Sequence, residues 1–360
     1  MKTYVDVQYN FMEAFDSDTG FYARSGVIEN GKDTGVDPFM RSYPGLIDIG
    51  IMGSCQHART GQCLRAGVQC YQGGSTVVQP DMPLADYKRV IDQSRGKTMQ
   101  VALGGRGDPN LHADFEAVLA YTRENGIVPN YTTSGMLLSD EQIALSKEYC
   151  GAVAVSWYGA DYTVTALRRL IDAGVTTNVH YVLNKSTIEQ AGDMLANEDS
   201  LPSGLNAVIF LLHKPVGLGK QEEVLSLDMP AVREFFYLVE HGHFPYKLGF
   251  DACSIPGIAT QAPSLDSTYF DSCEGGRYSM YISPGMIATP CSFDQGFEYG
   301  YKLGNIEDAW NSPQFEAFRN ILRNACPACP IRDVCMGGCP LHPEIVLCGH
   351  IHCAGFAGFH

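Results

Sequence analysis

Cysteine is the residue type with the clearest chemical potential in this chain, because a thiolate can bind metal. The chain has 360 residues and thirteen cysteines. Their distribution is uneven: three lie between 55 and 70, one stands alone at 150, and nine fall between 253 and 353. A chain of this length does not need disulfides to fold, so the pattern favours metal binding or redox chemistry.

The three early cysteines follow an apolar run at 46–52. Seven residues separate Cys55 from Cys63, and six separate Cys63 from Cys70. In parallel βα folds, chemistry gathers at the carboxyl ends of the strands. Three thiolates there can hold three irons of a four-iron cluster and leave the fourth iron open, whereas an electron carrier usually offers four thiolates. We therefore expect a catalytic cluster at these three residues.

Four late cysteines form the densest spacing pattern. Cys326, Cys329, Cys335 and Cys339 follow one another with gaps of two, five and three residues. Thiolates at such intervals are typical metal ligands. Two close pairs also suit tetrahedral zinc, so these four residues alone leave zinc and iron–sulfur open. Five further cysteines flank the group, namely Cys253, Cys273, Cys291, Cys348 and Cys353.

Alternating strands and helices must position the early cysteines. From residue 46 onward, short apolar runs alternate with amphipathic stretches, which is typical of βα units around a parallel sheet. Strands are predicted at 46–52, 98–103, 128–132, 152–157, 177–183 and 207–212. Helices are predicted at 111–124, 139–149, 162–173, 187–197 and 229–241. These units predict an α/β fold with a partial (βα)6 TIM-like barrel.

The regular alternation stops after about residue 215. A segment rich in Gly, Pro and Cys then runs to the end, and it has too little regular structure to bury a core without bound metal. The polar and aromatic residues at 1–45 predict a short hairpin-like extension. The predicted domains are therefore 1–45 for the extension, 46–245 for the barrel and 246–360 for a cysteine-rich domain.

Polar or flexible residues stand near the ends of the predicted strands. Gly104 and Gly105 end the second strand and would let a ligand approach the backbone closely. Asp108 follows and could accept hydrogen bonds from an amino group. Later strands add Ser134, Ser156, Asn178 and His180. Each of these residues taken singly is better explained as structural, but at one end of a barrel they become candidates for cofactor binding.

Charge and hydropathy narrow the class of partners. The net charge is −15, from 25 Lys+Arg against 40 Asp+Glu, and such a chain repels nucleic-acid phosphates and anionic lipid. No basic segment followed by an apolar one stands at the start, and the apolar run at 207–212 is too short to span a bilayer. We expect a cytoplasmic protein that binds neither nucleic acid nor membrane.

These features together resemble the radical S-adenosylmethionine (SAM) superfamily over roughly residues 46–215. The resemblance rests on 46–49, on the Cys70–Tyr71 pair, on the Gly104–Gly105 turn and on 153–156. The gaps between the early cysteines are wider than the three and two residues usual in that family. In that family, three cysteines hold a [4Fe-4S] cluster whose open iron binds SAM. One electron then releases a 5′-deoxyadenosyl radical, which abstracts hydrogen from the substrate.

The resemblance implies roles for the residues at this end of the barrel. Cys55, Cys63 and Cys70 would hold the catalytic cluster. The expected SAM-binding residues are Tyr71, Gly104, Gly105, Asp108, Ser134, Ser156, Asn178 and His180.

The C-terminal segment resembles the SPASM extension of such enzymes over roughly residues 250–353. The gaps from Cys326 to Cys339 match its pattern, which usually carries two auxiliary [4Fe-4S] clusters. The resemblance implies one cluster on Cys326, Cys329, Cys335 and either Cys348 or Cys353. It implies that Cys273, Cys291 and Cys339 share the other, and Cys253 is the candidate for its fourth ligand. Cys150, at the end of a predicted helix, is then expected to be a buried structural thiol.

Enzymes with this extension most often modify ribosomally made peptides, so the resemblance implies a peptide maturase with three [4Fe-4S] clusters and SAM. Thioether or carbon–carbon crosslinking, epimerisation and oxidation all stay open. A reductant such as flavodoxin or ferredoxin, and a leader-binding partner, would assist it. Two alternatives remain at this point: a maturase of a folded protein such as a sulfatase, and a non-catalytic iron–sulfur electron carrier or zinc-stabilised binding protein.

Overall fold

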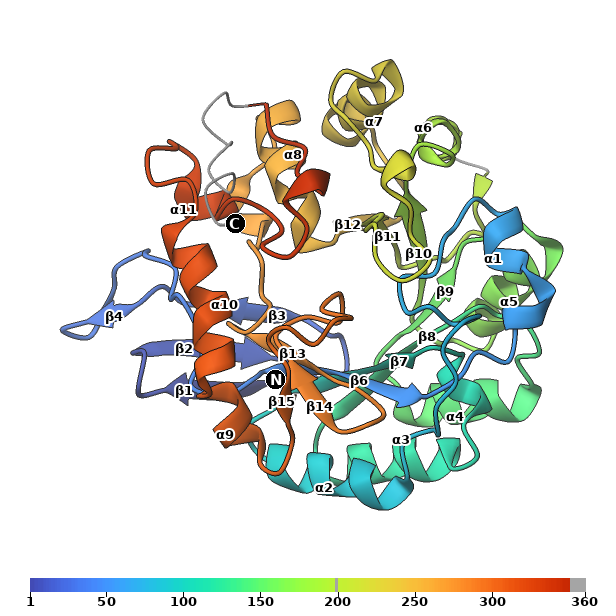
Figure 1. Ribbon diagram of the computed structural model, residues 1–360, viewed down its shortest axis with the longest axis horizontal. Helices are drawn as coiled ribbons and strands as arrows, with labels where there is room; N and C mark the ends of the chain where they lie inside the picture. Colours follow the sequence, from blue (N-terminus) through green and yellow to red (C-terminus); the bar gives the residue numbers. More distant parts are fainter. Residues whose placement is uncertain (198–199, 350–360) are drawn as a thin grey trace.

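The computed structural model describes residues 1–197 and 200–349. Its first element is a small antiparallel sheet of β1 (Lys2–Asp6), β2 (Phe11–Phe15) and β3 (Tyr22–Arg24). A two-stranded hairpin of β4 (Ile28–Glu29) and β5 (Lys32–Asp33) follows. The residues predicted to form a hairpin-like extension thus form two small sheets, which lie beside the C-terminal region (Figure 1).

A ten-stranded sheet forms the body of the molecule, in the order β12-β11-β10-β9-β8-β7-β6-β13-β14-β15. All pairs from β12 to β13 are parallel, and β14 and β15 are added antiparallel. The strands are β6 (Leu46–Met52), β7 (Gln100–Gly105), β8 (Val128–Thr133), β9 (Val153–Ser156), β10 (Thr177–Leu183), β11 (Ala207–Leu212), β12 (Lys247–Phe250), β13 (Ser279–Ile282), β14 (Ile287–Thr289) and β15 (Tyr301–Lys302). The predicted α/β class and partial barrel are confirmed.

Helices cover the outer face of the curved sheet (Figure 1). They are α1 (Gln62–Arg65), α2 (Leu84–Ser94), α3 (Phe115–Glu124), α4 (Asp140–Tyr149), α5 (Asp161–Asp172), α6 (Ile188–Ala196) and α7 (Pro230–His241). Ser139 forms a capping box with Gln142 at the start of α4. The prediction missed α2. It also began α3 too early, because Pro109–Leu111 form a separate 3-10 turn.

The strands of the barrel present two different faces. Along β10, Val179, Tyr181 and Leu183 are buried in the core, whereas Asn178, His180 and Val182 are only half-buried. This period of two places the second set on the inner, concave face of the sheet. Polar side chains therefore line the interior of the barrel, where a ligand could reach them.

The C-terminal region closes the side of the barrel next to β6. Its helices are α8 (Ile255–Gln261), α9 (Ile306–Trp310), α10 (Pro313–Asn324) and α11 (Arg332–Cys335). β12 lies just past residue 245, the predicted end of the barrel, and β13 extends the same sheet in parallel with β6. Trp310 is fully buried, and its indole N–H donates to the Arg41 carbonyl at 3.0 Å. The C-terminal region thus packs on both the barrel and the N-terminal extension.

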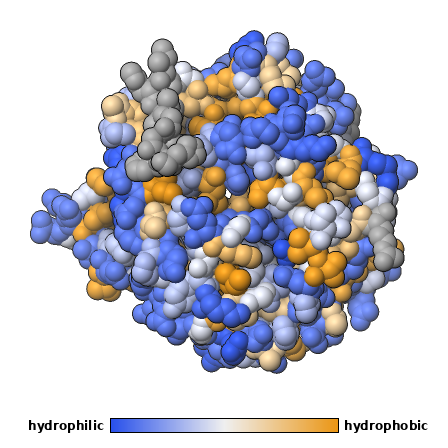
Figure 2. Space-filling model, in the orientation of Figure 1, coloured by the Kyte–Doolittle hydropathy of each residue, from blue (hydrophilic) through white to orange (hydrophobic). Residues whose placement is uncertain are grey.

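Among the described residues, no helix is both long and apolar enough to cross a membrane. On the face seen in Figure 2, hydrophobic residues form scattered patches among hydrophilic ones.

Candidate active site

The three early cysteines lie together in the loop after β6. The thiols of Cys63 and Cys70 are close enough to Cys55 to raise its pKa. Gly74 lies between the ends of this loop: a Cβ there would stand 3.0 Å from the Cβ of Cys55 and 3.5 Å from the sulfur of Cys70. The absence of a side chain at position 74 therefore lets the two cysteines approach each other at the carboxyl end of β6.

The thiols of Cys55 and Cys63 are uncharged at neutral pH when no metal is bound. Burial raises the pKa of Cys55 to about 11, and the neighbouring Cys63 and Cys70 add to the rise. Burial also raises the pKa of Cys63, whose sulfur lies 3.5 Å from the Tyr158 hydroxyl. Metal ligation needs thiolates and would release their protons.

Asp108 joins the cysteine loop to the ends of two strands. Its carboxylate accepts hydrogen bonds from Ser134, through the backbone N–H at 3.0 Å and the hydroxyl at 2.6 Å, and from the Thr133 hydroxyl at 3.1 Å. His57, inside the cysteine loop, places Nε2 3.3 Å from the same carboxylate. The structure therefore brings two predicted site residues, Asp108 and Ser134, into contact beside the loop.

Two of the predicted glycines have different surroundings. Gly105 has φ +117°, and a Cβ there would lie 2.5 Å from the Met52 carbonyl, so the close packing of β7 on β6 requires glycine. Gly104 is half-buried on the inner face, and a Cβ there would lie 3.8 Å from Asp48 Oδ1. Glycine at position 105 is therefore required by the packing of the two strands. Glycine at position 104 places no side chain next to the Asp48 carboxyl group.

Three further predicted residues lie along the inner face of β9 and β10. Ser156 and His180 are directly in register, and His180 Nδ1 lies 3.3 Å from the Thr132 hydroxyl. Burial lowers the pKa of His180 to about 4, so the imidazole is neutral. Asn178 lies nearer the amino end of β10 and accepts from the Asn206 amide at 2.7 Å. Ser156 and His180 are brought together, whereas Asn178 points to the opposite end.

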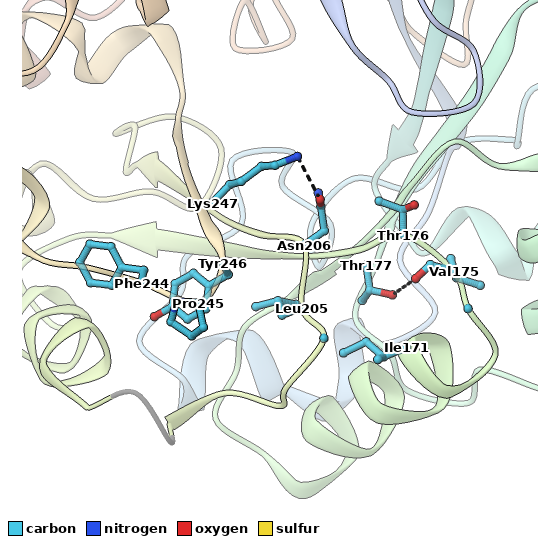
Figure 3. A pocket seen from close by; sticks show the side chains of 12 residues that line it. Ile171, Val175, Thr176, Thr177, Leu205, Asn206, Phe244, Pro245, Tyr246 and Lys247 are labelled. Atoms are coloured by element: carbon cyan, nitrogen blue, oxygen red, sulfur yellow. Dashed lines mark hydrogen bonds between the residues drawn. The ribbon is translucent and has the colours of Figure 1, made fainter.

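Two of the pockets in the described part of the chain lie beside the barrel, one of them next to the cysteine loop. A pocket of about 680 Å³ lies at the amino ends of β10–β12, lined by residues such as Thr177, Asn206 and Lys247 (Figure 3). A second pocket, of about 460 Å³, is lined by residues 64–68 of the loop and by 157–159 after β9. A small molecule bound next to the cysteine loop would therefore fit in the second pocket.

Asp48 is a site candidate that the sequence analysis did not single out. It lies on the inner face of β6, in register with Tyr281 of β13. Burial raises the pKa of Asp48 to about 7, and a hydrogen bond from Ser292 opposes the rise. Asp48 also acts on the ionisation of Tyr71, the residue after Cys70. A carboxyl that titrates near neutral pH therefore faces the interior between the early cysteine loop and Ser292.

The late cysteines separate into two groups. The first contains Cys253, Cys273, Cys291 and Cys339: Cys253 and Cys339 hydrogen bond to each other, and Cys253 acts on both Cys273 and Cys291. Burial raises the pKa of Cys273 to about 12. The group contains the three residues that the SPASM resemblance placed on one cluster, together with Cys253, the candidate for its fourth ligand.

The second group contains Cys326, Cys329 and Cys335. Burial raises the pKa of Cys335 to about 11, and both partners contribute to the rise. Of the two candidates for a fourth ligand, Cys348 is half-buried and disulfide-bonded in this structure, so its disulfide would have to be reduced before it could bind iron. Cys353 lies outside the described residues. Among residues 1–197 and 200–349, no three His, Cys, Asp or Glu side chains converge closely enough to hold a single metal ion. The cluster assignments therefore rest on which thiols are neighbours.

Cys150 stands apart from all three groups. It ends helix α4, packs against the main core, and has its pKa raised to about 12 by burial.

Ring contacts join the early and late cysteine groups. The Tyr71 ring, next to Cys70, lies 4.4 Å from the Phe293 ring, two residues after Cys291. The Gln295 amide also donates to Gln72 at 3.3 Å. The first late group therefore borders the same interior as the early loop.

Comparison with known proteins identifies this arrangement. Residues 273–330 match the SPASM family, an iron–sulfur cluster-binding domain. The chain is 24% identical over 302 residues to the mycofactocin maturase MftC of Mycobacterium ulcerans, covering 77% of this chain and 80% of that protein. It is 22% identical over 269 residues to the PqqA peptide cyclase of Methylocella silvestris, covering 65% of this chain and 67% of that protein.

A similar fold occurs in Streptococcus suis SuiB, whose crystal structure was determined bound to S-adenosylmethionine. The two chains superpose with a TM-score of 0.63 at 16% identity, covering 87% of this chain and 78% of SuiB. The chain therefore shares its fold with SuiB, and residues 273–330 match an iron–sulfur cluster-binding domain. The predicted resemblance to radical SAM enzymes with a SPASM domain is confirmed.

Proposed function

We propose that this enzyme generates a 5′-deoxyadenosyl radical and uses it to modify a ribosomally made peptide. The observation that carries the proposal is the placement of the Cys55, Cys63 and Cys70 thiols at the mouth of a polar barrel interior, with a second thiol group across the Tyr71–Phe293 contact. The names of two relatives, a mycofactocin maturase and a PqqA peptide cyclase, support a peptide as substrate. Bound SAM and a [4Fe-4S] cluster would supply the radical chemistry.

The proposed SAM site spans the loop and the strand ends. Cys55, Cys63 and Cys70 hold the cluster. Tyr71, Gly104, Asp108 and Ser134 border the amino-acid part of SAM. The pocket next to residues 157–159 suits the adenosine part, because it is the cavity that the loop itself lines. Ser156 and His180 line the approach to it, Gly105 fixes the turn, and Asn178 supports the inner wall.

The proposed auxiliary clusters use the two late thiol groups. Cys253, Cys273, Cys291 and Cys339 hold one cluster, and Cys326, Cys329 and Cys335 hold the other together with Cys348 or Cys353. The proposed domains are 1–45, a barrel over 46–245, and a cluster domain over 246–360, joined through the shared sheet.

Among the possible modifications, the site favours an oxidative one, such as crosslinking, over epimerisation. Oxidation of a peptide radical releases a proton and an electron, whereas epimerisation is redox-neutral. Asp48 faces the interior with a pKa of about 7, which suits a proton acceptor. The first late thiol group borders the same interior and suits an electron acceptor.

The proposed cofactors also suggest a cellular location and partner proteins. We place the enzyme in the cytoplasm, where thiols stay reduced, with flavodoxin or ferredoxin as the reductant. A separate leader-binding partner could present the peptide.

The test is anaerobic reconstitution followed by iron and sulfide counting and by assay of 5′-deoxyadenosine. We expect about twelve irons per chain, from three four-iron clusters, and 5′-deoxyadenosine when SAM and dithionite are added. Replacing Cys55, Cys63 and Cys70 together by Ala should remove about four irons and abolish the product. The matched control Cys150→Ala should change neither. Zinc with little iron, or product formation by the triple variant, would refute the proposal.

A pooled set of synthetic peptides then tests the substrate class. We expect peptides in the pool to lose mass as pairs of hydrogens in the presence of SAM, by mass spectrometry. Peptides left unmodified while a folded sulfatase is oxidised would favour the folded-protein alternative.

A further inference from the structure

A buried lysine lies at the end of the barrel next to the first late cysteine group. Lys214 follows β11, and its side chain is almost fully shielded from solvent. Its ammonium forms an ion pair with Asp251, the residue after β12. Asp251 also accepts from the Leu212 N–H at 3.0 Å and from the Ser254 hydroxyl at 2.7 Å. A buried charge of this kind is costly to maintain, so its position calls for an explanation.

The ammonium lies between two loops that carry cysteines. Its Nζ is 4.3 Å from the centroid of the Phe293 ring, two residues after Cys291. On the other side, Asp251 is two residues before Cys253. Lys214 is therefore held where these two loops face each other.

The positive charge of Lys214 reaches several of these thiols. Burial acts to lower the pKa of Lys214, but Asp251, Cys253 and Cys339 outweigh it, so the lysine stays protonated. At Cys291, burial raises the thiol pKa and the Lys214 charge opposes that rise. The charge acts in the same direction at Cys253, where the contact with Cys339 is the largest cause of the raised pKa.

Asp251 opposes the effect of Lys214 at Cys253. Its carboxylate is also engaged by the Leu212 N–H and the Ser254 hydroxyl, which offset part of its negative charge. The charge of Lys214, which faces Phe293, is therefore only partly cancelled by its partner.

We propose that Lys214 is the charge partner of the auxiliary cluster on Cys253, Cys273, Cys291 and Cys339, and that it makes this cluster easier to reduce. The inference rests on the proposed function, because it assumes that these four thiols hold a cluster. Four thiolates give a [4Fe-4S] cluster a net negative charge, and reduction adds one more electron. A nearby buried cation stabilises the reduced form most, and charge near a cluster is one of the properties that set its potential.

The test is an EPR-monitored redox titration of the reconstituted holoenzyme without substrate. The main variant is Lys214→Met combined with Asp251→Asn, which removes the pair without leaving a lone buried charge. We expect one of the three clusters to become at least about tenfold harder to reduce, which for one electron is about 59 mV more negative. Lys214→Arg keeps the charge and should titrate like the wild type. The control Lys220→Gln removes an exposed lysine from the same segment and should do the same.

The outcomes distinguish the two proposals. A wild-type protein that holds fewer than three clusters contradicts the proposed function itself. A double variant that keeps its full iron and all three wild-type potentials overturns the role of Lys214. If the double variant loses about four irons while Lys214→Arg retains them, the charge is needed to hold the cluster, which supports the inference. Loss of iron from both variants would overturn it, because packing and not charge would then matter.

Discussion

The raised pKa of Asp48 should make the stability of the folded protein depend on pH. An aspartate in an unfolded chain has a pKa of about 3.9, whereas burial raises the pKa of Asp48 in the fold to about 7. The folded state therefore binds this proton more tightly. Its stability falls as pH rises from about 4 to about 7, because the buried carboxyl must then be ionised.

Asp48→Asn removes this pH-dependent cost. One pKa unit corresponds to about 1.36 kcal/mol, so between pH 5 and pH 8 the variant should gain about 2.5 kcal/mol relative to the wild type. For a chain of this length, that gain corresponds to a relative rise of about 3 °C in melting temperature. The half-buried position of Asp48 makes both figures upper values.

Differential scanning calorimetry of the holoenzymes at several pH values provides the assay. The wild type and the Asp48→Asn variant carry the same clusters. Any loss of stability that comes from cluster breakdown at acid pH is therefore the same in both and drops out of the difference. Asp92→Asn is the control, because it makes the same chemical change at an exposed position. A melting difference for Asp48→Asn that stays constant, or that grows toward acid pH, would refute the assignment of a raised pKa.

Three other substitutions test the packing that supports the site. Gly74→Ala should lower the iron bound at the early loop by about four per chain, because its Cβ would stand 3.0 Å from that of Cys55; wild-type iron content would contradict this. Arg41→Met should lower the free energy of unfolding by about 3–5 kcal/mol. The substitution leaves the buried Glu13 carboxylate, which lies 2.8 Å from Arg41 Nε, without its partner. An unchanged melting temperature would argue against a stabilising ion pair. Ser139→Ala should cost about 1 kcal/mol through loss of the helix cap, measurable as a small melting shift with unchanged 5′-deoxyadenosine formation.

The sequence by itself determined the parallel barrel. The strands at 46–52, 177–183 and 207–212 match β6, β10 and β11 to the residue, because short runs rich in Val, Ile and Leu are a local signal of β-strands. The cap at Ser139 is also a local feature, since its two hydrogen bonds span only three residues. The close spacing of Cys326, Cys329 and Cys335 is local too, because these three thiols form one group, whereas Cys339 lies with Cys253.

The tertiary structure alone decided how the C-terminal region meets the barrel. β13 pairs with β6, more than two hundred positions earlier in the chain, and a four-residue strand carries too little local signal to predict such a long-range pairing. Asp48 and Lys214 gained their significance in the same way. The ionisation of Asp48 depends on burial and on Ser292, and that of Lys214 depends on Asp251 and two late cysteines. Only the folded chain brings these groups together. Spacing can therefore nominate the thiols, but burial and charge around them are properties of the fold.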